Sequence, residues 1–136
     1  MASATVARLV AARAHRDLSD LARLGVGTIS SEQSCRERIE AARRLRVLAN
    51  ELVDLVVLAE ALGGATWQEI TKALQRRDAA TVQAEYEDDV QEWQSAPAEP
   101  FDGIDDAQGL DAWYRVHRED SDPPAENPVS DLLRMG

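Results

Sequence analysis

The stretch Gly63-Gly64-Ala65-Thr66-Trp67-Gln68-Glu69-Ile70 decides how the fold of this chain is interpreted. Its paired glycines can adopt the left-handed conformation that closes a helix. Thr66 and Glu69 have the spacing of a capping box, in which the hydroxyl accepts from the amide of residue 69 and the carboxylate accepts from the amide of residue 66. Trp67 and Ile70 then begin an apolar stripe at helical spacing. The stretch therefore predicts that one helix ends near residue 62 and that a short capped helix begins near residue 67.

Apolar periodicity on both sides of this stretch predicts further helices over residues 4–24, about 32–62, 67–75 and 78–94. The longest carries a heptad-like seam, formed by Leu45, Leu48, Leu52, Leu55, Ala59 and Leu62. Val47, Val53, Val56 and Val57 add apolar surface away from that seam. The C-terminal half of this helix is therefore expected to be buried on two sides, either by its own domain or in part by a second copy. The second alternative is a homodimer through the Leu45–Leu62 helix.

The predicted fold class is all-α, a small bundle of about four helices over residues 3–95 with a helix-turn-helix-like core. Residues 96–136 are predicted to form an acidic, partly disordered tail, since Pro, Asp and Gly dominate from Ser95 to Gly109 and residues 119–128 have the composition of disorder. A short amphipathic segment lies between the stretch that ends at Gly109 and residues 119–128, and it contains Leu110, Trp113, Tyr114 and His117. The predicted domains are thus 1–95 and 96–136.

The net charge of −10 is unevenly distributed. Residues 1–48 hold nine arginines against five acidic residues, whereas residues 79–136 hold three basic residues against fifteen acidic ones. Phosphate binding would therefore belong to the first part, because the second part repels nucleic acid.

Several functional classes are not supported by the residues present. Cys35 is the only cysteine, which excludes an internal disulfide and favours a reducing, cytoplasmic setting. Met1–Val10 has no apolar core of a signal peptide, and the apolar segment Leu52–Leu62 is too short to span a bilayer. His15 and His117 lack neighbours typical of a metal or catalytic site. We therefore expect no enzyme, no cofactor, no metal and no membrane partner.

Residues 52–86 resemble a small helix-turn-helix segment common in actinobacterial proteins, whose pattern includes Gly-Ala-(Ser/Thr)-Trp-x-Glu-Ile followed by Leu-Gly-Val-(Ser/Thr)-Arg-Gln-Ala-Ala. The matching residues are Gly64, Ala65, Thr66, Trp67, Glu69, Ile70, Leu74 and Ala80. The resemblance covers about a quarter of the chain and implies a DNA-binding protein whose second short helix enters the major groove. It implies DNA contacts within residues 66–83, at Lys72, Arg76, Arg77, Thr81 and Gln83.

The second half of the motif departs from this pattern. Gln75-Arg76-Arg77 stands where the family has Gly-Val-(Ser/Thr), and Asp78-Ala79 stands where it has Arg-Gln. The helix that follows carries Glu85, Glu87, Asp88 and Asp89. Carboxylates at these places would oppose phosphate contacts.

Two functions remain open. The first is a small DNA-binding transcriptional regulator of helix-turn-helix type, acting at transcription or on a mobile element. The alternative is an acidic protein–protein interaction module (an adaptor, an antitoxin-like protein or a nucleic-acid mimic) that has lost DNA binding. The tail could contact a protein partner through Trp113, Tyr114, Leu132 and Leu133, or it could fold back and shield the Arg-rich N-terminal half.

Overall fold

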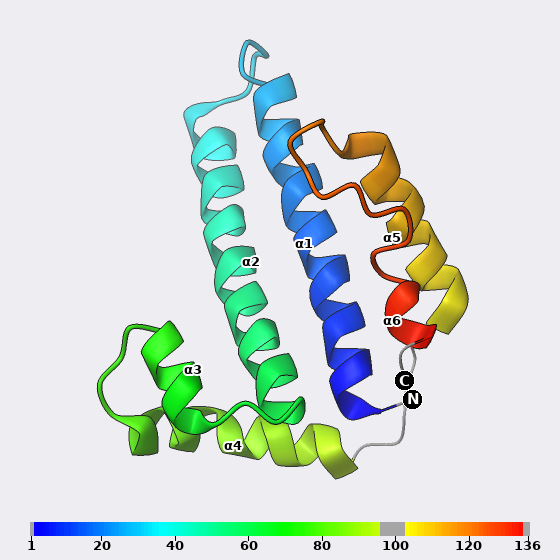
Figure 1. The fold of residues 1–136 in the computed structure, drawn as a ribbon. Helices are drawn as coiled ribbons and strands as arrows, with labels where there is room; N and C mark the ends of the chain where they lie inside the picture. Colours follow the sequence, from blue (N-terminus) through cyan, green and yellow to red (C-terminus); the bar gives the residue numbers. More distant parts are fainter. Residues whose placement is uncertain (1, 96–102, 135–136) are drawn as a thin grey trace.

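The computed structural model describes residues 2–95 and 103–134, and within these ranges the chain forms six helices and no strand (Figure 1). The helices are α1 (Ser3–Gly27), α2 (Cys35–Leu62), α3 (Trp67–Ala73), α4 (Ala79–Ser95), α5 (Gly103–His117) and α6 (Asp131–Arg134). The prediction of an all-α helical bundle is confirmed for the described residues.

Helices α1 and α2 form a long antiparallel hairpin, and α5 lies along the other side of α1 (Figure 1). Small residues allow this close packing, since Ala7 and Ala11 are buried on α1 together with Leu9. The leucine seam of α2 is half-buried or buried along its length. We infer that it faces α1, so the α1–α2 contact occupies the surface that the sequence offered to a second copy.

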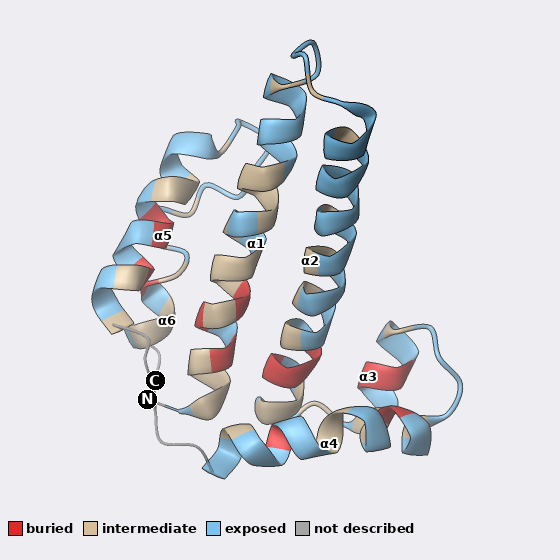
Figure 2. Cartoon of the chain, turned by 180° about the vertical axis from the view of Figure 1, so that it is seen from behind, coloured by how far each residue is buried: buried red, intermediate tan, exposed pale blue. Residues whose placement is uncertain are grey.

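The C-terminal end of α2 is covered on a second side by α3 and α4, as Figure 2 shows by the change from exposed to buried colouring there. Val57, Ile70 and Val82 form a buried cluster that joins these three helices. The partly buried hydrophobic residues packed against it are Ala61, Ala65, Trp67, Leu74 and Tyr86. The two-sided burial predicted for this half of α2 is therefore found only at its end, since Val57 is buried whereas Val47, Val53 and Val56 are exposed.

The described part of the C-terminal region packs on α1. Trp113 Nε1 on α5 donates to Asp20 Oδ1 on α1 at 3.1 Å. Asp111 is 1% exposed, and its Oδ1 accepts from the backbone amides of Val129 at 2.7 Å and Ser130 at 3.3 Å. These bonds tie the segment that leads into α6 to α5.

The structure differs here from the expectation of a linker and a disordered stretch. Residues 103–109 lie in α5, and residues 96–102 of the expected linker are outside the described residues. Residues 119–128 follow a defined path, because Tyr114 Oη donates to Pro123 O at 2.6 Å and Arg118 Nη1 donates to Ala125 O at 2.7 Å. Composition measures average polarity, so it does not register single bonds from side chains to carbonyl groups.

Candidate interaction surface around helix α4

Helix α3 begins with the capping box that the sequence predicts. The amide of Glu69 donates to Thr66 Oγ1 at 3.1 Å, and the amide of Thr66 donates to Glu69 Oε1 at 3.0 Å. The hydrogen bond from the Thr66 backbone, followed by that from its side chain, lowers the pKa of Glu69. Gly64 precedes the box with φ of +102°, which only glycine adopts readily. The entry into α3 is thus fixed by local bonds.

The turn between α3 and α4 forms without the glycine of the family pattern. Gln75 occupies the left-handed region with φ of 59°, directly after Leu74, which ends α3. The amide of Gln75 donates to Lys72 O and that of Arg76 donates to Thr71 O, each at 3.0 Å. The side chain at 75 makes this backbone conformation cost about 1 kcal/mol more than glycine would.

Arg76 pairs with an acidic residue of the following helix. Its Nη1 and Nη2 donate to Oε2 and Oε1 of Glu85 at 3.0 and 2.8 Å. The hydrogen bond between them, ahead of their Coulomb attraction, raises the pKa of Arg76, and the same bond lowers the pKa of Glu85. This two-point ion pair spans the turn, so the guanidinium that was predicted to contact DNA is engaged inside the chain.

Asp78 caps the start of α4. Its Oδ2 accepts from Thr81 Oγ1 at 2.6 Å, and its Oδ1 accepts from the amide of Ala80 at 3.1 Å. The bond from Thr81, ahead of that from Ala80, lowers the pKa of Asp78. The carboxylate that replaces the family's arginine therefore stabilises the helix N-terminus.

The five predicted DNA contacts consequently divide into two groups. Arg76 is bonded to Glu85, Thr81 is bonded to Asp78, and the half-buried Gln83 donates to Glu87 Oε1 at 3.3 Å. Lys72 and Arg77 are exposed on α3 and on the turn. Three of the five predicted DNA-contacting side chains thus form hydrogen bonds within the chain.

The outer face of α4 is strongly negative. Val82 and Val90 are buried on its inner side, whereas the exposed carboxylates are Glu85, Asp88, Asp89 and Glu92. The helix sequence contains no lysine or arginine. We call these four carboxylates the α4 acidic face. It presents a dense negative charge at the position where the resemblance implies a DNA-reading helix.

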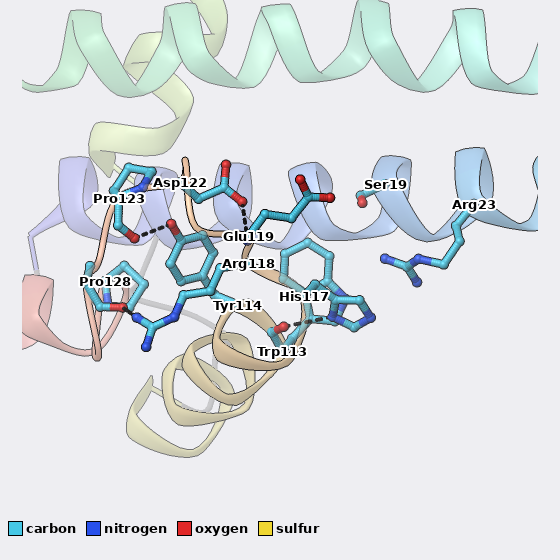
Figure 3. Close-up of a pocket in the computed structure, with 11 residues that line it drawn as sticks. Ser19, Arg23, Trp113, Tyr114, His117, Arg118, Glu119, Asp122, Pro123 and Pro128 are labelled. Carbon is cyan, nitrogen blue, oxygen red and sulfur yellow. Dashed lines mark hydrogen bonds between the residues drawn. The ribbon is translucent and has the colours of Figure 1, made fainter.

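A second candidate site lies between α1, α5 and the segment after α5 (Figure 3), where an open cavity of about 580 Å³ is lined by Arg23, Trp113, His117 and Arg118 among others. The Trp113 and His117 rings lie 4.9 Å apart, and His117 Nδ1 lies 2.8 Å from Trp113 O. Arg118 pairs with Glu126 at 2.8 Å, which raises the pKa of Arg118.

The polar groups of this cavity serve mainly to hold the chain together. Tyr114 and Trp113, which the sequence offered as partner anchors, donate to Pro123 and Asp20 of the same chain. Leu132 and Leu133 are half-buried. The geometry therefore describes a structural clasp on α1 better than a ligand site.

The described residues hold no cluster of three metal-ligating side chains, and none of their buried side-chain polar atoms lacks a hydrogen-bond partner. Within the same parts of the chain, no helix has the length and apolar character needed to cross a membrane.

Comparisons with known proteins add no relative. A scan against protein-family models, a search of curated proteins and a search of solved structures each return no match.

The sequence pattern missed several side chains that organise this region. Tyr86 donates to Asp54 Oδ1 at 2.8 Å, which joins α4 to α2. No local sequence pattern indicates this partner, which lies 32 positions away in the chain. Asp111 and Asp20 were likewise counted only as acidic residues, since a buried cap and a free carboxylate look alike in sequence.

Proposed function

We propose that this chain is a non-enzymatic interaction module built on a helix-turn-helix-like arrangement of α2, α3 and α4, and that the α4 acidic face binds a basic surface of a protein partner. The observation that carries the proposal is the exposure of Glu85, Asp88, Asp89 and Glu92 on a helix without a basic residue. Opposite charge on a partner would steer association and select against nucleic acid.

Phosphate contacts are disfavoured on this face for two reasons. Each phosphate contact gains affinity by releasing counterions, and a carboxylate in the same place repels the phosphate instead. In addition, the Arg76 guanidinium is held by Glu85, so it would have to exchange one charged partner for another. The same charge arrangement resembles that of a nucleic acid, which a basic partner would recognise.

The second candidate is the DNA-binding regulator that the resemblance implies. It is favoured by the exposed Lys72 and Arg77, which lie on α3 and on the turn, within the segment 66–83. In this alternative these two residues would contact the phosphate backbone, while Thr81 and Gln83 would exchange their local bonds for base contacts.

The test measures two probes against the full-length chain by fluorescence anisotropy at low salt. One probe is a fluorescein-labelled peptide rich in lysine and arginine, and the other is a labelled random-sequence DNA duplex. We expect the peptide to bind, with an affinity that falls as salt rises, and the duplex to show no binding tighter than about 10⁻⁴ M. Tight duplex binding without peptide binding would instead support the regulator.

A matched pair of triple variants locates the peptide site. Asp88→Asn/Asp89→Asn/Glu92→Gln removes three charges from the α4 acidic face, and we expect it to weaken peptide binding at least tenfold. Glu32→Gln/Glu119→Gln/Asp120→Asn removes three exposed charges elsewhere and should leave most of the affinity. Equal losses in both variants would show that only the net charge matters, which would overturn the assignment to α4.

A further inference from the structure

One exposed line of side chains runs along α2 on the side opposite its leucine seam. It consists of Ile39, Arg43, Arg46, Asn50 and Val53, which follow one another at steps of four and three residues. Because an α-helix turns by about 100° per residue, these five positions lie within an arc of about 80°. All five are exposed, and Figure 2 shows the exposed colouring along this part of α2. We call these five residues the α2 stripe.

The two arginines of the α2 stripe are not neutralised by the chain. Residues 41–50 hold Arg43, Arg44 and Arg46 and no acidic residue, although the net charge of the chain is −10. Neither Arg43 nor Arg46 has an ion-pair or hydrogen-bond partner among the described residues. The arginines that do form ion pairs in the same ranges are Arg16, Arg23, Arg36, Arg76, Arg118 and Arg134. The α2 stripe therefore offers two guanidinium groups to an acceptor outside the chain.

The surroundings of the α2 stripe favour a protein carboxylate over a phosphate as that acceptor. Glu51 and Asp54 lie on the same stretch of α2, and α4, which carries the α4 acidic face, packs on the C-terminal end of α2. A nucleic-acid backbone that followed the stripe would approach these carboxylates and be repelled by them. In addition, Ile39 and Val53 (55% and 46% exposed) stand at the two ends of the stripe, where a phosphate chain would leave them without an apolar contact.

We propose that the α2 stripe docks an acidic amphipathic helix of a protein partner. Carboxylates in the middle of that helix accept from Arg43 and Arg46, since a guanidinium and a carboxylate match in a two-point hydrogen bond. Apolar side chains nearer its two ends cover Ile39 and Val53, in the manner of an amphipathic helix on an exposed surface. The site prefers the opposite charge to that preferred by the α4 acidic face, and the inference does not rest on the partner proposed there.

The length of the α2 stripe sets the length of the partner segment. The 14 positions from residue 39 to residue 53 correspond to about 21 Å of helix, or about four turns. Beyond Val53, the next position of the same line is Val57, which is buried in the cluster with α3 and α4. A partner helix of about 15 residues therefore covers the exposed part of the line.

The first test measures three labelled probes against the full-length chain by fluorescence anisotropy. The main probe is a helical peptide of about 15 residues, with glutamate in the middle turns of one face and leucine near both ends of that face. We expect it to bind with an affinity that falls as salt rises. A polyglutamate of the same length should bind at least about tenfold more weakly, because it lacks the apolar contacts.

Three outcomes would overturn the proposal. Absence of binding by the helical peptide at low salt would show that the α2 stripe is no docking site for an acidic helix. Equal binding of the helical peptide and polyglutamate would show that only charge is recognised. The third probe is a labelled single-stranded RNA, and RNA binding tighter than that of the peptide would assign the arginines to a nucleic acid.

Matched variants locate the contact. Arg43→Gln/Arg46→Gln should weaken binding of the helical peptide by about tenfold or more, with unchanged helix content, since both side chains are exposed. Arg8→Gln/Arg134→Gln removes the same charge from exposed positions on α1 and α6, and it should retain most of the affinity. Equal losses in the two variants would show that net charge alone matters and would overturn the assignment to α2.

A second pair of measurements tests the ends of the α2 stripe. Ile39→Gln/Val53→Gln should weaken binding of the leucine-bearing peptide and leave that of polyglutamate unchanged. Nuclear magnetic resonance of the isotope-labelled full chain should show the largest amide shift changes at residues 39–53 when the helical peptide is added. Largest changes at other basic positions, such as Lys72 and Arg77, would overturn the proposal.

Discussion

The Tyr86 hydroxyl donates a 2.8 Å hydrogen bond to Asp54 Oδ1, and this bond joins α4 to α2 on the side away from α1. Burial of the phenol, reinforced by the bond to Asp54 and the negative charge of that carboxylate, raises the pKa of Tyr86 to about 12. The orientation of α4, and with it the direction in which the α4 acidic face points, therefore depends on a polar contact beside the Val57–Ile70–Val82 cluster.

Tyr86→Phe keeps the ring and removes only the donor. We expect the free energy of unfolding to fall by about 1 kcal/mol at pH 7, measured by urea denaturation. In the wild type, the raised pKa means that the neutral phenol favours the folded state. This stabilisation is fully present below pH 10 and is lost as the pH rises toward 12.

Ultraviolet absorption during an alkaline titration checks the second part of this prediction. One of the two tyrosines should ionise near pH 12, and that late transition should be absent from Tyr86→Phe and present in Tyr114→Phe. Two tyrosines that both ionise near pH 10 in the folded protein would contradict the bond to Asp54.

The strained residue of the α3–α4 turn gives the second prediction. Gln75 has φ of 59°, so Gln75→Gly should relieve left-handed strain and raise the free energy of unfolding by about 1 kcal/mol, or Tm by about 4 °C. Gln75→Ala keeps a Cβ and should give no comparable gain. Gly64→Ala is the opposite case, since φ is +102° there, and it should lower Tm. A Tm that is unchanged in Gln75→Gly would show that the turn is not strained.

How well the sequence predicted the α3–α4 region depends on how far apart along the chain the interacting residues lie. The α3 capping box was predictable, because Thr66 and Glu69 are three residues apart and their bonds are local. The sequence showed Gln75 where the resembling pattern has glycine, and a left-handed glutamine and the Arg76–Glu85 pair complete the turn. The sequence showed that pair only as two separate charges.

The C-terminal region, in contrast, was poorly predicted from the sequence. Its acidic composition predicted a tail, yet the described residues 103–134 are held by Trp113, by Asp111 and by donors to backbone carbonyls. Each of these bonds joins positions that no short pattern relates, and one spans 93 residues. Long-range contacts of single polar side chains are thus the part of this fold that sequence patterns did not reveal.

The α1–α5 contact should respond to acid. The hydrogen bond from Trp113 Nε1, followed by that from Arg23, lowers the pKa of Asp20 below its ordinary value. A carboxylate whose pKa is lowered by folding stabilises the folded state above about pH 4, and this contribution is lost as the pH falls through the lowered value. We therefore expect α5 to loosen from α1 in acid.

Nuclear magnetic resonance of the Trp113 indole N–H follows this change directly. Its chemical shift should move with a midpoint below pH 3.8, and the signal is assigned by its absence in Trp113→Phe. In Asp20→Asn the amide oxygen can still accept from the indole, but it has no proton to bind in this range. The shift should then be nearly independent of pH, and a titration that persists in this variant would assign it to another carboxylate.

The buried cap at Asp111 gives the last prediction. Its carboxylate accepts from the amides of Val129 and Ser130, and removing it leaves two donors without their acceptor beside α5. Asp111→Ala should lower the free energy of unfolding by about 2 kcal/mol.

The loss of stability in Asp111→Ala should be local, because the bond that holds α5 to α1 remains. Amide hydrogen exchange should accelerate at residues 129–133 and stay slow in α1, whereas Asp131→Ala, which removes an exposed carboxylate nearby, should leave the exchange at Val129 and Ser130 slow. Equal acceleration in both variants would mean that this segment is held by its apolar residues Leu132 and Leu133 rather than by the buried carboxylate.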